Sequence, residues 1–177
     1  MRFVRLFGFL FVALALVAGC GGAAGTSAQA GGTAGSAAHG ASGAQALQFT
    51  ATTIDGARFS EKSLAGKPAV LWFWAPWCPI CRSEAPGVAK AAQAGTGVTF
   101  VGVAARDQLP AMKQFVANYH MGSFTHLADL DGAVWQHFGI TEQPAFAFIG
   151  ANGAVDIVKG TLSEQQLTER LRQLSRT

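Results

Sequence analysis

The chain has 177 residues, of which 50% are hydrophobic and only 13% are charged, and its formal net charge is +3. Arg2 and Arg5 supply most of that excess, because without them 11 basic residues face 10 acidic ones, a balance of +1. The rest of the chain has no basic run and no basic stripe interleaved with aromatic residues, which argues against nucleic-acid binding.

Residues 1–19 are expected to be a secretory signal peptide. The basic start is followed by an apolar stretch from Leu6 to Ala18 and by small residues before Cys20. The alternative is an uncleaved anchor, although the stretch is shorter than the about 20 residues that span a membrane. The ending Val17-Ala18-Gly19-Cys20 resembles a bacterial lipobox, which implies cleavage before Cys20 and attachment of lipid to that residue.

Residues 20–46 are expected to be the lipidated cysteine and a flexible linker. From Gly21 to Ala46 the chain contains only Gly, Ala, Ser, Thr, Gln and one His. Such a segment cannot bury enough apolar surface to fold. Residues 47–177 have the size of one domain with a single hydrophobic core.

The domain begins with a predicted β-hairpin, in which residues 48–53 and 57–59 flank the turn Asp55-Gly56. The apolar run 69–74 predicts a buried strand, and residues 79–94 predict a helix that Pro86 would kink. A second continuous apolar run, 98–104, is typical of a parallel sheet that is covered on both faces.

The second half predicts two further helices, a short strand and a hairpin. Five residues fall on one face of the first helix: Leu109, Met112, Phe115, Val116 and Tyr119. A short strand over 124–128 and a short helix over 133–138 follow, and then a hairpin of 144–149 and 154–158 around Asn152-Gly153. Ser163 and Gln166 form a capping box for the last helix. The order predicts an α/β fold with a mixed central sheet between helices and an N-terminal β-hairpin.

The chemistry of the domain is expected at Cys78 and Cys81, the only cysteines left if Cys20 carries lipid. Cys78 immediately precedes a helix whose first position suits Pro79, and there the N–H groups and the helix dipole favour a thiolate. We therefore expect Cys78 to attack disulfides and Cys81, one turn further on, to resolve the mixed disulfide.

A metal site is the alternative for this cysteine pair. Zinc prefers four ligands, but the chain has no second cysteine pair, and His120, His126 and His137 lack metal-ligand spacing. Arg82 follows the pair where covalent haem attachment requires His. We expect neither a metal nor another cofactor.

The residues from Phe73 to Cys81, together with Pro86, resemble the thioredoxin superfamily. Further matching segments identify its extracytoplasmic TlpA-like and DsbE/DsbF-like branch: Phe49 and Asp55-Gly56, Leu64 with Gly66-Lys67, residues 127–132, residues 138–140 and Gln143-Pro144. The resemblance covers Leu47 to Leu174.

The resemblance implies a thioredoxin-like fold with a cis peptide bond before Pro144, the alternative being an ordinary trans turn. It also implies that the backbone of Gln143 pairs with an incoming peptide like an added strand. An apolar rim would surround the thiol and bind extended clients: Pro76, Trp77, Pro79, Ile80 and Pro144.

Two departures from the family pattern stand out. Many thioredoxins carry a buried acid six residues before the first cysteine, where this chain has Trp72. Glu84 and Glu142 are the candidate replacements as proton relay, although the usual exposure of Glu favours a solvated position for Glu84. Ala145-Phe146 follows the loop proline, where branch members that reduce apocytochrome c usually continue with Thr or Glu.

The predicted function is that of a membrane-tethered, extracytoplasmic thiol–disulfide oxidoreductase that introduces disulfides into exported proteins. The resemblance implies a membrane partner, linked to quinone, that re-oxidises the cysteine pair. One alternative is a reductase of the same fold that serves cytochrome c maturation and draws electrons from a membrane thiol carrier. The other is a non-enzymatic lipoprotein that binds metal or peptide.

Overall fold

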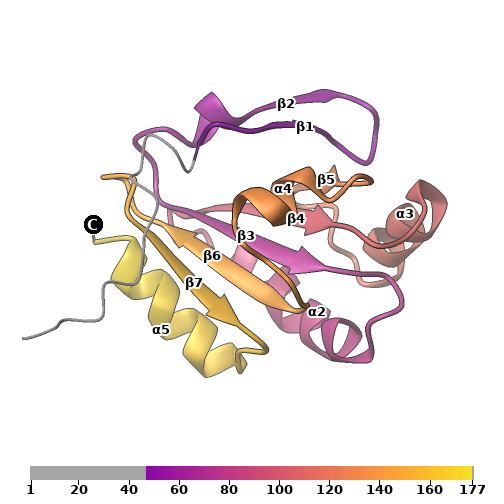
Figure 1. The fold of residues 1–177 in the computed structure, drawn as a ribbon. Helices are drawn as coiled ribbons and strands as arrows, with labels where there is room; N and C mark the ends of the chain where they lie inside the picture. Colours follow the sequence, from indigo (N-terminus) through magenta and orange to yellow (C-terminus); the bar gives the residue numbers. More distant parts are fainter. Residues whose placement is uncertain (1–46, 177) are drawn as a thin grey trace, which may run out of the picture. The chain divides into compact units, whose positions relative to one another are not determined.

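The computed structural model describes residues 47–176 (Figure 1). The predicted signal peptide, the lipid-bearing Cys20 and the linker lie outside these residues. None of the helices in the described part has the length and apolar character needed to cross a membrane.

The described chain begins with the predicted hairpin. Strand β1 (Thr50–Thr52) pairs antiparallel with β2 (Arg58–Ser60). Gly56 adopts φ = 87° in the turn, a left-handed conformation that costs glycine little. A short 3₁₀ helix, η1 (Glu61–Leu64), follows and buries Leu64.

The central sheet has five strands in the order β5-β4-β3-β6-β7. Their bounds are β3 (Ala69–Trp74), β4 (Thr99–Ala104), β5 (Thr125–Ala128), β6 (Ala145–Ile149) and β7 (Val155–Lys159). Strands β3, β4 and β5 run parallel, whereas β6 is antiparallel to both β3 and β7. The sheet is therefore mixed, as predicted, and all six residues of its middle strand β3 are buried.

Helices cover both faces of the sheet. Their bounds are α2 (Pro79–Gln93), α3 (Leu109–Asn118), α4 (Ala133–His137) and α5 (Glu164–Leu174). Trp72 and Trp74 of β3 share one core with buried residues of α2, α3 and α5. Leu71 and Phe73 belong to a second core, which they share with residues of α4 and with hydrophobic residues of the N-terminal hairpin. Figure 1 shows α4 and this hairpin on the side of the sheet opposite to α2 and α5.

Local sequence signals determine where helices α5 and α2 begin. Both hydrogen bonds of the predicted capping box between Ser163 and Gln166 are present at the start of α5. Cys78 is the N-cap of α2, and Pro79 occupies the first helical position. Since β3 ends at Trp74, α2 begins at the carboxyl edge of the parallel strands, where α/β sheets commonly bind their ligands.

Candidate active site

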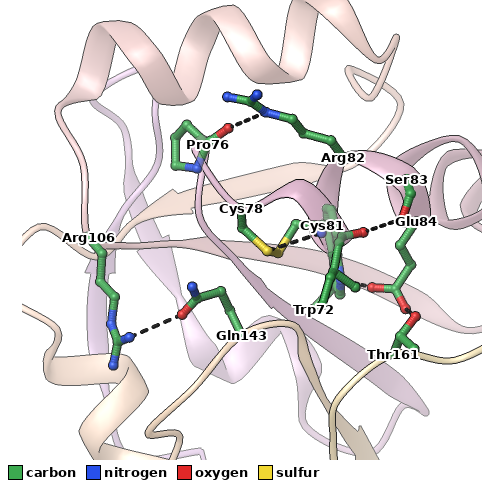
Figure 2. Close-up of a disulfide and its surroundings, with 11 residues drawn as sticks. Trp72, Pro76, Cys78, Cys81, Arg82, Ser83, Glu84, Arg106, Gln143 and Thr161 are labelled. Carbon is green, nitrogen blue, oxygen red and sulfur yellow. Dashed lines mark hydrogen bonds between the residues drawn. A yellow bond between two sulfur atoms is a disulfide. The ribbon is translucent and has the colours of Figure 1, made fainter.

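Cys78 and Cys81 form a disulfide at the start of α2, with their Cα atoms 5.3 Å apart (Figure 2). The backbone N–H of Cys81 donates a hydrogen bond to Sγ of Cys78 at 3.1 Å. Cys78 is 3% exposed and Cys81 is fully buried. The structure thus places the predicted nucleophile nearer to solvent and directs a helix amide at its sulfur.

An apolar rim flanks the disulfide. Trp77 is 48% exposed and Ile80 is 51% exposed, both large values for apolar side chains in a folded domain. Pro79 between them is also exposed, whereas Pro76 is buried and its carbonyl accepts a hydrogen bond from Nε of Arg82 at 2.9 Å. Trp77, Pro79 and Ile80 therefore present exposed apolar surface next to the disulfide.

The loop before β6 supplies the other side of the site. The peptide bond between Gln143 and Pro144 is cis, the isomer that the resemblance implied. Phe73 of β3 lies opposite Ala145, so the neighbouring Pro144 lies at the same sheet edge as the end of β3. Pro144 is buried and Gln143 is half-buried, which leaves part of Gln143 accessible beside the cysteines.

Arg106, which the sequence analysis did not single out, connects these two sides. Its carbonyl accepts a hydrogen bond from Nε1 of Trp77 at 2.9 Å. Its guanidinium donates to Oε1 of Gln143 at 3.1 Å and to the carbonyl of Thr141 at 2.6 Å. Figure 2 shows Gln143 and Arg106 reaching toward each other. The position just after β4, a parallel neighbour of β3, is the signal that could have indicated this residue.

Glu84 is 8% exposed, so the expectation of a solvated helix position is wrong. Its Oε2 accepts from Nε1 of Trp72 at 2.9 Å. Its Oε1 accepts from the hydroxyl of Thr161 at 2.9 Å and from the backbone N–H of Leu162 at 2.8 Å. These donors make burial of a carboxylate tolerable, which the helical position alone could not reveal (Figure 2).

Burial raises the pKa of Glu84 above its ordinary value, although the hydrogen bonds from Leu162, Thr161 and Trp72 act in the opposite direction. Trp72 therefore replaces the acid found in many thioredoxins and at the same time donates to an acid on α2. Glu142, the other predicted relay residue, is exposed in the loop before β6.

Within residues 47–176, no three His, Cys, Asp or Glu side chains gather closely enough to hold a metal ion. His126 is buried, and its Nε2 lies 2.9 Å from the carbonyl of Met121. Asp129 is buried as well, but its carboxylate accepts the backbone N–H groups of Val134 and Trp135 at the start of α4. Both carboxylate oxygens of Asp129 and the Nε2 of His126 thus have backbone partners, whereas Nδ1 of His126 is buried without a hydrogen-bond partner among the described residues.

Comparison with known proteins gives consistent matches. The profile of the AhpC/TSA family matches residues 42–158. The soluble secreted antigen MPT53 of Mycobacterium tuberculosis is 46% identical over 134 residues, which cover 74% of this chain and 77% of MPT53. The thiol:disulfide interchange protein DsbE of Pseudomonas fluorescens is 31% identical over 118 residues, or 66% of this chain and 65% of DsbE. The solved structure of MTB DsbF superposes on this chain with a TM-score of 0.72 and is 55% identical to it in sequence. The match covers 73% of this chain and 97% of the DsbF chain.

Proposed function

The chain belongs to the AhpC/TSA family of thioredoxin-like proteins and is a thiol–disulfide oxidoreductase, and from this we propose that it introduces disulfides into exported proteins. The redox pair is Cys78 and Cys81, and the clients are reduced proteins outside the cytoplasm. The relationship to MPT53, named as a secreted antigen, supports export.

The reaction starts from the disulfide form. A client thiolate attacks Sγ of Cys78, which forms a mixed disulfide, breaks the Cys78–Cys81 bond and releases Cys81 as a thiolate that takes up a proton. A second client thiolate then attacks the client sulfur of the mixed disulfide and releases Cys78 as a thiolate. Two client thiols become one disulfide, and the two electrons remain on the cysteine pair until a membrane oxidant, linked to quinone, removes them.

The observation that carries this proposal is the position of Cys78. It caps α2 and accepts a hydrogen bond from the N–H of Cys81 at 3.1 Å. Helix amides and the positive end of the helix dipole stabilise a thiolate. A stabilised thiolate is a good leaving group, and its stabilisation favours the reduced protein, which makes the disulfide form more oxidising.

We assign to Glu84, one turn further along α2, the role of exchanging a proton with the thiol of Cys81. A buried carboxylate with a raised pKa can accept a proton and return it, directly or through water. Glu142 is the less suitable relay, because it is exposed on a separate loop, whereas Glu84 is buried and bonded to Trp72.

Clients would bind at the apolar rim and at the loop that precedes β6. Trp77, Pro79 and Ile80 offer exposed apolar surface beside Cys78. The backbone of Gln143, next to Pro144, can pair with an extended peptide like an added strand. Lipid on Cys20 would tether the domain to the outer face of the cytoplasmic membrane.

Equilibration of the pure protein with glutathione redox buffers tests the direction of electron flow. A reduction potential of about −120 to −180 mV is the expected result for an oxidant of exported proteins. A value near that of thioredoxin, about −270 mV, would favour the reductase that serves cytochrome c maturation. Failure to exchange with glutathione at any ratio would instead favour the non-enzymatic scaffold.

A further inference from the structure

We propose that Arg106 is a positioning residue that joins Trp77 to the loop before Pro144 and so selects extended polypeptides over small thiols. This inference rests on the proposed function and concerns how clients reach Cys78. Two independent features of Arg106, its backbone conformation and its side-chain contacts, support it.

The first feature is the backbone of Arg106, which has φ = 62°. This left-handed conformation is uncommon for a residue with a side chain and persists only where the surroundings impose it. Here it accompanies a carbonyl that accepts the hydrogen bond from the half-exposed indole of Trp77 at 2.9 Å. The unusual backbone conformation of Arg106 thus occurs together with the hydrogen bond that holds the side chain of Trp77 beside Cys78.

The second feature is the guanidinium, which bonds to two points of the loop before Pro144. It donates to the carbonyl of Thr141 at 2.6 Å and to the side chain of Gln143 at 3.1 Å. The planar fork of arginine can make both bonds from one orientation, which the single ammonium of lysine cannot reproduce.

A buried platform fixes the orientation of that fork. The guanidinium carbon lies 4.9 Å from the ring centroid of Trp135, which is buried. The indole of Trp135 is in turn held by a hydrogen bond from its Nε1 to the carbonyl of Val103 at 3.2 Å. Arg106 is exposed as a residue, but its charged group is held between α4 and the loop before Pro144.

The consequence differs between classes of substrate. An extended peptide must contact the Trp77 side and the Gln143 backbone together, so an edge that is already ordered lowers the entropic cost of binding. A small thiol needs only the sulfur of Cys78. Loss of the Arg106 contacts should therefore slow exchange with peptides and leave exchange with small thiols almost unchanged.

The test compares Arg106→Lys and Arg106→Gly in the oxidised protein. Lysine keeps the positive charge but loses the fork, whereas glycine tolerates the left-handed backbone and keeps the carbonyl bond to Trp77. Arg58→Lys, at an exposed position of β2, is the matched control. The measured quantities are the rate constants for reaction with a reduced ten-residue peptide that contains one cysteine and with dithiothreitol, together with the reduction potential.

Both Arg106 variants should react with the peptide at least tenfold more slowly, with the dithiothreitol rate within twofold and the potential unchanged. Arg58→Lys should match the wild type in all three measurements. An equal fall with both thiols, an unchanged peptide rate, or full activity in Arg106→Lys would each overturn the inference. If the proposed function itself were wrong, either the wild type would oxidise neither thiol, as a non-enzymatic scaffold, or its reduction potential would lie in the range expected for the reductase.

Gln143→Ala provides a second test that leaves Arg106 and the backbone of the client site in place. It removes one of the two bonds between the guanidinium and the loop, so the peptide rate should fall by less than in Arg106→Lys. The double variant should be no slower than Arg106→Lys, because both substitutions break the same contact. Additive losses would mean that the two residues act independently and would contradict the proposal.

Discussion

The indole Nε1 of Trp72 donates a hydrogen bond of 2.9 Å to Oε2 of Glu84, which joins the middle strand of the sheet to the helix that starts at Cys78. The buried carboxylate near the cysteines therefore comes from α2, and β3 supplies the indole N–H that donates to it. Glu84 also accepts from Thr161 and Leu162, so one carboxylate connects β3, α2 and the segment before α5.

We predict that Glu84→Gln slows the resolution of mixed disulfides by roughly 10²-fold, the lower end of what general acid–base catalysis contributes. Glutamine cannot take up or release the proton of Cys81, although it fills similar space. Stopped-flow measurement of client release from a preformed mixed disulfide at pH 7, as Cys81 attacks Cys78, follows this step. If Glu142→Gln slowed this step and Glu84→Gln did not, the proton relay would be Glu142 and not Glu84.

The same variant should change the pH dependence of stability. The pKa of Glu84 is raised in the folded state, so its favourable contribution is complete below about pH 4.5 and is lost as the pH rises through the folded-state value. The wild type should therefore be more stable relative to Glu84→Gln at pH 4 than at pH 8. Urea unfolding of both oxidised proteins at the two pH values measures the free energies of unfolding. If the stability of the wild type relative to Glu84→Gln rose with pH, the raised pKa of Glu84 would be contradicted.

The two cysteines should behave differently when each is replaced. We predict that Cys81→Ser accumulates mixed disulfides with clients that contain a disulfide, because Cys78 still attacks that disulfide and no resolving thiol remains. Cys78→Ser should trap none, because Cys81 is fully buried. Non-reducing electrophoresis after alkylation counts the trapped species. Equal trapping by both variants would show that the roles are not divided in this way.

The tether can be tested on the full-length chain in cells. We predict that Cys20→Ala moves the domain from the membrane fraction to the extracytoplasmic soluble fraction, because the lipid would have no attachment site. Fractionation and immunoblotting measure the distribution, with Cys78→Ala as a control that keeps the lipid. Retention of Cys20→Ala in the membrane would instead support an uncleaved N-terminal anchor.

Most of the fold could be predicted because its signals are local. The apolar run from Ala69 to Trp74 became β3 with the same bounds, and Asn152-Gly153 became the turn between β6 and β7. The capping box at Ser163 likewise depends on residues within one helical turn. The 3₁₀ helix η1, which has no strong periodic pattern, was not predicted.

In the candidate active site, the residues of the Cys-x-x-Cys motif could be predicted from the sequence, whereas the environments of Glu84 and Arg106 could not. The cysteine pair follows from residues that the sequence displays directly, whereas the cis bond before Pro144 was implied by the resemblance to the thioredoxin superfamily. Glu84 was assigned to solvent because its partners Thr161 and Leu162 lie 77 and 78 residues further along the chain. Arg106 was missed for the same reason, since its bonds to Thr141 and Gln143 form only when the sheet brings separate loops together.

A buried histidine away from the cysteines should control stability at acid pH. Burial lowers the pKa of His126 to about 4, against opposing effects from the hydrogen bond to Met121 and the charge of Asp55. The unfolded state binds more protons between about pH 4 and 6.5, so stability is complete above about 6.5 and is lost as the pH falls toward 4.

The variant His126→Gln can still donate to the Met121 carbonyl but does not titrate. We predict that the wild type loses up to about 3 kcal/mol relative to this variant between pH 7 and pH 4. Urea unfolding at both pH values measures the change, and Glu84 and Asp129 cancel because both proteins contain them. Parallel pH profiles for the two proteins would mean that His126 does not titrate in this range.

Gly102 of β4 is packed closely against that histidine. A Cβ atom added at Gly102 of β4 would lie 2.2 Å from Nδ1 of His126 and 2.9 Å from Nε1 of Trp74. Both rings are buried, so neither can move aside as an exposed side chain would. Alanine at this position must therefore shift a strand or a ring inside a close-packed core.

We predict that Gly102→Ala lowers the free energy of unfolding by about 3 kcal/mol or more, the upper range for overpacking a core. Gly122→Ala is the matched control, because an added Cβ there meets nothing within 4 Å and its backbone is not left-handed. That control should leave stability unchanged or raise it by up to about 1 kcal/mol through a less flexible unfolded chain. Equal effects of the two substitutions in urea unfolding would show that β4 and His126 do not pack this closely.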